Sequence, residues 1–240
     1  MGITKATTTQ RIAKTAAAPR SAAARGRQKN ANASTDEKRD RILKAAEGLF
    51  DQLGYANTTM EHIVRQLGVS KPFVYYYFRN KQEIFETLSW RPAVACFTAM
   101  DFAAEDPRPA HEKVCIGIER LVRATLEHHP AAFFYYREPQ VYRPEYVTAQ
   151  KKMANHFYEQ LCTQLEAGRS AGMFDFRETR ITAQAACSLP GFLYNWYRPD
   201  GRLSLDEVVH ELSLLAYRVL GLQSTPLKAP APATVRAGGR

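Results

Sequence analysis

Apolar residues recur at helical spacing along most of this chain, and one short stretch combines that pattern with turn signals. Between Thr58 and Lys81, two groups of apolar residues are separated by Gly68 and Ser70. Glycine often ends a helix in the left-handed conformation, and serine often caps the next helix. We therefore predict two short helices joined by a tight turn, with Thr58 and Glu61 as a capping box at the start of the first. This arrangement is typical of a helix-turn-helix, whose second helix lies in the DNA major groove.

The same periodicity predicts one helix before this motif and several after it. The first begins at a capping box of Ser34 and Glu37 and ends at Gly54. Another starts at Asn80, and Pro92 is expected to kink or break it. No later segment alternates with a period of two, as strands would. We therefore expect an all-α fold, with further helices at 93–103, 109–128, 131–138, 144–170, 178–197 and 204–221.

Composition divides the chain into four parts. Residues 1–33 are rich in Ala, Thr and Arg and contain almost no large apolar residue, so we expect a disordered basic arm. Residues 223–240 are rich in Pro, Ala and Gly, and we expect a disordered tail there. Between them we predict a three-helix DNA-binding domain at 34–81 and a helical body at 82–222.

Positive charge is concentrated at the two ends of the chain. The formal net charge is +9, but residues 1–35 hold seven basic residues and no acid, and three more basic residues follow Leu222. The middle of the chain is therefore close to neutral, and the net charge alone does not indicate DNA binding. The stretch from His62 to Gln82 is more informative, because it holds four basic residues and no acid. Such a surface suits a DNA duplex, which carries roughly one negative charge per 1.7 Å.

One ordered set of residues covers about a fifth of the chain. It comprises Ile42-Leu43, Ala45-Ala46, Leu49-Phe50, Gly54-Tyr55, Thr58-Thr59-Met60, Ile63, Gly68-Val69-Ser70-Lys71, Val74-Tyr75, Tyr77-Phe78 and Lys81. This set resembles the N-terminal domain of TetR-type bacterial transcriptional regulators, and differs from their usual pattern at Pro72-Phe73. The resemblance implies a DNA-binding head, a helical body that binds a small effector, a homodimer and a palindromic operator in double-stranded DNA.

Three residues at the start of the predicted recognition helix are candidates for reading bases. Lys71 can donate to guanine O6 and N7, and Phe73 can contact a thymine methyl group. Ser70 lies beside them. The alternatives are that Ser70 only caps the helix and that Phe73 turns into the core.

Five further residues are candidates for contact with phosphates. The family resemblance implies this role for the hydroxyl groups of Tyr75 and Tyr76. Lys81 can add its charge to the positive end of the following helix, or it can be an ordinary solvated lysine. Thr58 and Thr59 can be caps only, or the free backbone N–H groups near them can hold a phosphate.

Aromatic residues gather in the second half of the chain, where most of them must form the core. The segment from Phe133 to Arg143 mixes rings with arginines, which is the composition of an apolar pocket with a few polar anchors. The segment from Asn195 to Ser204 resembles the C-terminal end of TetR-type regulators of fatty-acid and acyl-CoA degradation. That resemblance implies an acyl-CoA, or an aromatic or fatty carboxylic acid derivative, with an arginine available for its phosphate or carboxylate. The candidate pocket residues are Phe133, Phe134, Arg137, Tyr142, Phe157, Leu161 and Trp196.

The last predicted helix is apolar on more than one face, so it needs cover on two sides. Its own chain or a second copy could provide that cover. The resemblance favours a second copy, because the last two helices of these regulators pair across a two-fold axis. A palindromic operator also calls for two heads. The candidate interface residues are Val208, Leu212, Leu215 and Val219.

Several kinds of chemistry find no support in the sequence. The four cysteines are far apart, and neither they nor the histidines have partners at metal-ligand spacing. Motifs such as HExxH, GxSxG, the P-loop and GxGxxG are missing, so we expect no enzyme, metal or cofactor. No run of eighteen apolar residues occurs, so we expect no membrane partner, and the resemblance implies a bacterial cytoplasmic protein.

These observations favour a dimeric transcriptional regulator, expected to be a repressor that a small effector releases from DNA. Two alternatives remain open. The first is an architectural DNA-binding protein that needs no ligand, and the second is an enzyme that acts on a thioester. The sequence does not identify the effector, the operator, the target genes or the direction of regulation.

Overall fold

The computed structural model describes residues 22–223, with side chains described from Thr35 onward. The chain divides into a unit up to Asp40 and a unit from Arg41 onward, and each is described by itself. Within residues 22–223 the structure is helical, with one isolated bridge between Phe174 and Leu222 and no strand. This confirms the predicted all-α fold. The rest of the predicted arm and tail, at 1–21 and 224–240, lies outside the described residues.

Helix α1 spans Ala22–Asn57, so it begins well before Ser34. The predicted capping box of Ser34 and Glu37 is wrong, because both residues lie inside the helix. Residues 22–33, predicted to be disordered, are helical, which agrees with the high helix propensity of their alanines and arginines. The sequence predicted that the helix ends at Gly54; Gly54, with a φ of +77°, interrupts it, and α1 then continues to Asn57.

The predicted helix-turn-helix is formed by α2 (Met60–Leu67) and α3 (Lys71–Tyr77). Gly68 separates them with a φ of +63°, the left-handed conformation that ends α2. Ser70 precedes α3 in extended conformation. The two helices and their turn therefore lie where the sequence placed them.

Helix α4 spans Lys81–Phe97 and continues through Pro92, which was expected to kink or break it. Pro92 lacks an N–H group for the helix ladder, but it is buried, and packing offsets that loss. The separate helix predicted at 93–103 is therefore wrong. The elements that follow are α5 (Ala110–Glu127), η1 (Ala131–Phe133), α6 (Phe134–Arg137), η2 (Pro139–Val141), α7 (Pro144–Ser170), α8 (Thr179–Ser188), η3 (Leu189–Phe192), α9 (Leu193–Trp196) and α10 (Leu205–Val219).

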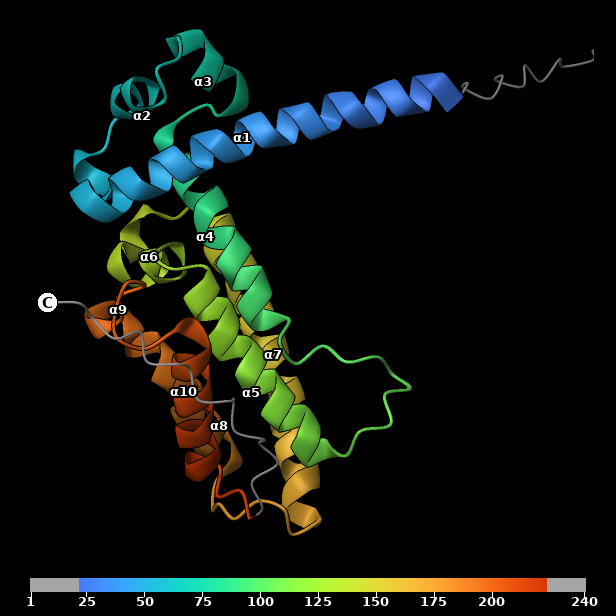
Figure 1. Ribbon diagram of the computed structural model, residues 1–240. Coiled ribbons are helices and arrows are strands. Elements are labelled where there is room, and N and C mark those ends of the chain that lie inside the picture. The colour runs from blue at the N-terminus through green and yellow to red at the C-terminus, as the bar shows by residue number, and fades with distance from the viewer. Residues whose placement is uncertain (1–21, 224–240) are drawn as a thin grey trace, which may run out of the picture. The chain divides into compact units, whose positions relative to one another are not determined.

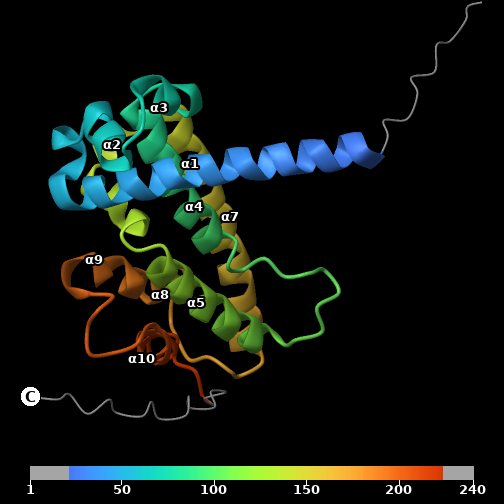
Figure 2. The ribbon, with the colours of Figure 1, turned by 45° about the horizontal axis from the view of Figure 1, so that its top comes forward.

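In the unit from Arg41 onward, α5 packs against α4, α7 and α10, and α8 packs against α7 and α10 (Figures 1 and 2). Helix α4 runs from the neighbourhood of α2 and α3 into this bundle (Figure 1). The predicted capping box of Ser204 and Glu207 starts α10. Across residues 22–223, none of the helices has the length and apolar character needed to cross a membrane.

Two apolar clusters hold this unit together. The body cluster combines residues of α5, α7, α8 and α10, such as Ile118, Leu165 and Leu212. The head cluster combines residues of α1 to α4, and it also contains residues from η1, α6 and α7 and the segment before α7. The predicted domain boundary after Lys81 therefore cuts through the head cluster. The residues that the head cluster takes from beyond α4 are Ala131, Phe134, Tyr142 and Tyr146.

Candidate nucleic-acid interface and effector cavity

Helix α3 turns one face into the head cluster and the other toward solvent. Val74 and Phe78, four residues apart, are buried in the cluster. Tyr76 is 80% exposed and Tyr75 is 40% exposed. Both tyrosine hydroxyls are therefore available to a partner outside the chain, as a phosphate contact requires.

Lys71 is exposed at the start of α3, but it forms an ion pair with an acidic residue of α2. Its ammonium group donates to Oε1 of Glu61 at 2.7 Å and lies 5.6 Å from the centre of the Tyr75 ring. This hydrogen bond raises the pKa of Lys71 and lowers the pKa of Glu61. Both side chains are more than half exposed, so the pair is weak and DNA can replace Glu61. Glu61 lies just before the acid-free stretch, so the sequence pattern does not reveal that it competes with DNA for Lys71.

Ser70 and Phe73 differ in how far their side chains are available to contact DNA. Ser70 is exposed and makes no side-chain capping hydrogen bond, so its hydroxyl is not committed to α3. Phe73 is half-buried, with its ring 5.4 Å from that of Tyr77. The Phe73 ring therefore packs partly against Tyr77 of its own helix, and only part of it is available to a base.

Lys81 points into the protein, which corrects its predicted role as a phosphate ligand. Its ammonium group donates to the carbonyl oxygens of Tyr55 and Thr58 at 2.8 Å each and of Ala56 at 3.3 Å. It also lies 4.3 Å from the centre of the Tyr55 ring, and burial lowers the pKa of Lys81. An ammonium group has three N–H donors, so none is left for a phosphate. Lys81 ties the α1–α2 connection to the start of α4.

Thr58, predicted to cap α2 and to lie at a phosphate contact, does neither, because it is buried and Thr59 forms the cap. Thr58 is fully buried, and its hydroxyl lies 2.8 Å from the Gly54 carbonyl and 3.2 Å from the Leu49 carbonyl, so it stabilises the end of α1. Thr59 caps α2, because its hydroxyl accepts from the backbone N–H of His62 at 3.2 Å. The predicted capping box of Thr58 and Glu61 is therefore wrong, because the cap is Thr59 and the Glu61 carboxylate pairs with Lys71. Thr59 is exposed, and the first N–H groups of α2 beside it remain candidates for a phosphate.

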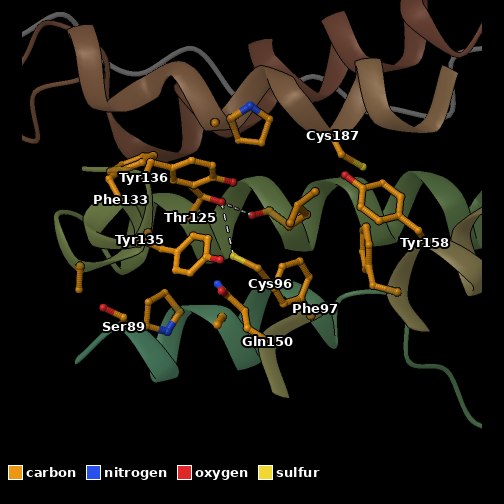
Figure 3. Close-up of a pocket in the computed structure, with 18 residues that line it drawn as sticks. Ser89, Cys96, Phe97, Thr125, Phe133, Tyr135, Tyr136, Gln150, Tyr158 and Cys187 are labelled. Atoms are coloured by element: carbon orange, nitrogen blue, oxygen red, sulfur yellow. Dashed lines mark hydrogen bonds between the residues drawn. The ribbon is translucent and has the colours of Figure 1, made fainter. Parts of the chain in front are cut away.

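A cavity of about 100 Å³ lies in the body, between α4, α5, α7 and the short elements η1, α6 and η3. Helix α4 contributes Ala93 to its wall, together with Cys96 and Phe97, which are labelled in Figure 3. None of the lining side chains carries a charge. The polar groups that reach the cavity are the side chains of Ser89, Thr125, Tyr135, Tyr136, Gln150 and Tyr158.

Some of these polar groups are already satisfied by the protein. Ser89 donates to the Phe85 carbonyl at 3.0 Å and shares a hydrogen bond of 2.6 Å with the Tyr142 hydroxyl. Thr125 donates to the Leu121 carbonyl at 2.9 Å. Tyr135 and Gln150 stand on the same side of the cavity as Cys96 (Figure 3). The cavity therefore has an apolar lining with a few polar groups around it, which is typical of small-molecule sites.

Two cysteines from different helices line this cavity. The Cys96 thiol lies 3.6 Å from the Thr125 hydroxyl, and Cys187 comes from α8. Burial raises the pKa of Cys96 to about 11 and that of Cys187 to about 12. Both thiols are therefore protonated at neutral pH and act as small apolar groups.

Of the seven predicted pocket residues, only Phe133 and Phe157 line the cavity. Phe134 and Tyr142 belong to the head cluster, and Leu161 belongs to the body cluster. Trp196 is exposed. The prediction failed because neighbouring residues of a helix point to different faces, and spacing alone does not show which face meets a cavity. The lining residues that it missed are mostly small or polar, and include Ala93, Cys96, Thr125, Gln150 and Cys187.

The predicted arginine anchor is also absent from the cavity lining. Arg137 donates to the carboxylate of Asp51 at 2.7 Å. Arg143 binds the carboxylate of Glu86, which is buried. Each arginine thus joins two parts of the unit, and neither lines the cavity.

The predicted interface residues on α10 fall into two groups. Val208 and Leu212 are buried in the body cluster of their own chain, and Leu212 is only 7% exposed. These two residues are therefore corrected to core positions. Leu215 and Val219 are 42% and 41% exposed, and Ile181 on α8 is also exposed. An interface on α10 would have to use these exposed residues.

Comparison with known proteins agrees with this architecture. The family model described as "Bacterial regulatory proteins, tetR family" matches residues 42–88, which contain the helix-turn-helix. A second model, described as "Tetracyclin repressor-like, C-terminal domain", matches residues 107–220. The two models therefore match the head and the body in the order that the sequence predicted.

Individual proteins show the same likeness over most of the chain. The chain is 23% identical to the HTH-type transcriptional regulator YhgD of Bacillus subtilis (strain 168), over 76% of this chain and 95% of YhgD. The crystal structure of the TetR family regulator PfmR from Thermus thermophilus has a TM-score of 0.66 and 24% identity, covering 77% of this chain and all of PfmR. The structure of AibR in complex with isovaleryl coenzyme A and operator DNA has a TM-score of 0.62 at 14% identity, over 77% of this chain and 99% of AibR. With its helix-turn-helix head and helical body, this chain belongs to the TetR family of DNA-binding transcriptional regulators.

Proposed function

We propose that the protein is a homodimeric repressor that a small ligand releases from a palindromic operator. We further propose that the ligand places a short, uncharged acyl or aryl group in the body cavity. The observation that carries the proposal is the course of α4. This helix begins in the head at Lys81, which ties down the α1–α2 connection, and it lines the cavity with Ala93, Cys96 and Phe97.

A single helix that touches both places can transmit a displacement. A ligand in the cavity presses on the last part of α4, and a packed helix moves as a rigid element. The head is attached to the start of α4, so the separation of the two recognition helices in a dimer changes. A change from mostly bound to mostly free needs about 5.5 kcal/mol of differential affinity between the two states.

The lining of the cavity restricts the chemistry of the group inside it. A free carboxylate would be buried there without a countercharge, which costs several kcal/mol. The acyl part of a thioester carries no charge. The cavity volume of about 100 Å³ is smaller than the ~150 Å³ of an engineered cavity that binds benzene, which favours a short acyl group. AibR, which shares the fold, has been solved with isovaleryl coenzyme A, a short acyl thioester.

The proposed dimer rests on the exposed apolar residues of α8 and α10. These helices pack together, and Ile181, Leu215 and Val219 remain exposed on them. A large exposed apolar patch usually marks an interaction site. Two recognition helices are also what a palindromic operator requires.

Selection from random DNA with the full chain tests the DNA part of the proposal. We expect recovery of a short palindrome, and reduced transcription from a promoter that carries it when the protein is added. Binding that coats DNA without regard to sequence would contradict a regulator and favour an architectural protein. Increased transcription would contradict repression.

Fluorescence anisotropy with the recovered operator then tests the ligand. We expect isovaleryl coenzyme A to weaken operator binding by about tenfold or more, and palmitoyl coenzyme A to act less well. Ala93→Leu fills part of the cavity and should abolish release while DNA binding persists. The matched control is Ala104→Leu, at an exposed position outside the cavity. If Ala93→Leu responded like the control, the cavity would not be the effector site.

A further inference from the structure

A groove separate from the effector cavity lies on the surface of the unit from Arg41 onward. It is formed by Asp51 of α1, by His129 and Arg137 around η1 and α6, and by Tyr194 and Arg198 at and after α9. We call it the arginine groove.

The groove has more positive than negative groups. Asp51 is its one carboxylate, and it is already paired with Arg137 at 2.7 Å. Arg198 is exposed and donates to the carbonyl of its neighbour Tyr197 at 3.0 Å, and within residues 35–223 no acidic side chain forms an ion pair with it. Guanidinium groups present a planar set of N–H donors that matches phosphate oxygens. An uncompensated arginine beside a second one is therefore a suitable place for a phosphate group.

His129 completes one wall without adding a fixed charge. Burial lowers its pKa, and Arg137 and Arg198 lower it further, while Asp51 acts in the opposite direction. The neutral ring can donate one hydrogen bond to a phosphate oxygen. The positive character of the groove therefore comes from its two arginines.

One aromatic residue that lines the effector cavity lies beside two residues of the groove. Phe133 lines the cavity, and its ring lies 5.9 Å from that of Tyr194 and 5.7 Å from that of His129, both in the groove. A ligand with an uncharged group and a phosphorylated group could therefore occupy both places around Phe133. The cavity would take the uncharged part, and the groove would take the phosphates.

The pair in the groove joins the two parts of the protein that the family models match. Asp51 lies in the head segment at 42–88, and Arg137 lies in the body segment at 107–220. We propose that the arginine groove binds the phosphate groups of a small ligand, and that this ligand takes Arg137 away from Asp51. Binding would thus remove an ion pair between head and body. Only this effect on the head rests on the proposed function, because phosphate binding itself needs no DNA.

Calorimetry with the full chain and no DNA tests the site. The probes are inorganic pyrophosphate and free coenzyme A, which separate a simple phosphate site from one that needs a larger phosphate ester. We expect Arg198→Ala to weaken binding by about tenfold. Arg202→Ala removes the same charge from the same loop outside the groove, and it should leave binding unchanged. No binding of either probe, or equal losses in the two variants, would overturn the site.

Asp51→Asn tests whether the Asp51 carboxylate and a phosphate compete for Arg137. We expect tighter binding of the probes in this variant, whereas Arg198→Ala should weaken it. Without the Asp51 carboxylate, Arg137 is free, so the variant should bind the probes several-fold more tightly than wild type. It should also bind the selected operator more weakly when no ligand is present. Weaker probe binding, or unchanged binding of both probe and operator, would overturn the competition. The effector cavity is tested separately by Ala93→Leu, because Ala93 does not line the arginine groove.

Discussion

The carboxylate of Glu86 on α4 accepts hydrogen bonds from Arg143 at the start of α7, from its backbone N–H at 2.8 Å and from its Nε at 2.7 Å. Glu86 is 4% exposed, so these bonds satisfy a buried charge. Nearby, the Gln82 side chain donates to the Val141 carbonyl at 2.6 Å. Helix α4 is thus tied to the body halfway between the head and the cavity, and its displacement must involve α7 or break these bonds.

The first prediction follows from this buried carboxylate. Glu86→Gln removes the charge, and its amide N–H₂ group faces the donors of Arg143. We expect the melting temperature, measured by scanning calorimetry, to fall by several degrees. Glu145→Gln, an exposed change in the first turn of α7, should have little effect. Equal melting temperatures for the two variants would mean that Glu86 contributes no stability.

Lys81→Met tests whether Lys81 stabilises the fold or binds a DNA phosphate. It leaves the carbonyl groups of Tyr55 and Thr58 without their donor, so the protein should melt several degrees lower. Well below the melting temperature, the slope of log affinity for DNA against log salt should match that of wild type. A slope reduced by about 0.9 would show that Lys81 neutralises a phosphate after all.

The pair of Lys71 and Glu61 gives a prediction about specificity. Glu61→Gln frees Lys71 and removes a negative charge from the DNA-facing surface, so affinity for all sequences should rise. Lys71→Ala should instead relax the preference at one position of each half-site, by roughly tenfold. Both effects can be measured by repeating the selection from random DNA. The same sequence preference in Lys71→Ala as in wild type would refute base reading by Lys71.

Two leucines of α10 give contrasting predictions about the dimer. Leu215 is exposed, so Leu215→Glu should give a folded monomer by sedimentation and lose operator binding. Leu212 lies in the body cluster, so Leu212→Glu should unfold or aggregate instead. Circular dichroism distinguishes the two outcomes. A Leu215→Glu variant that remained dimeric would place the interface elsewhere.

The cavity thiols provide a chemical test that needs no mutation. With a pKa of about 11, roughly one Cys96 thiol in a thousand is a thiolate at pH 8, and Cys187 with a pKa of about 12 is ionised even less. Since the thiolate is the reactive form, alkylation by iodoacetamide should be slow at pH 8 and faster as the pH rises. Peptide mass spectrometry would measure it, with the denatured chain as control. Rapid modification of the folded protein would show that the cavity is open to solvent.

The elements with clear local signals were predicted well from the sequence. Helix α7 has the predicted bounds because proline is favourable in the first turn, where Pro144 lies, and a glycine follows its end. Gly68 marked the turn of the helix-turn-helix, since a left-handed residue is easiest for glycine. Thr59 replaced Thr58 as a cap because two adjacent threonines give the same local signal.

The wrong predictions concern side chains whose positions depend on distant contacts. The sequence around Lys81 does not show that the carbonyl groups of Tyr55 and Ala56, at the end of α1, and of Thr58, after it, converge on this lysine. The cavity could not be located because the small residues that make room for it, such as Ala93 and Cys96, look like ordinary core residues of α4. A cavity depends on how the side chains of several neighbouring helices pack together, and the sequence of one helix does not show this.

The head cluster has a consequence for recombination between regulators of this family. Phe85 of α4 stacks on Phe134 with ring centres 4.9 Å apart, and Phe134 belongs to the body segment. A head transplanted onto a foreign body at the end of α4 would leave this ring without its partner and expose apolar surface. A chimera should stay soluble only if the transplanted piece carries Phe134, Tyr142 and Tyr146 as well, or if the recipient supplies equivalent rings. The unit of exchange between such regulators is therefore larger than the DNA-binding motif, and it extends into the first turn of α7.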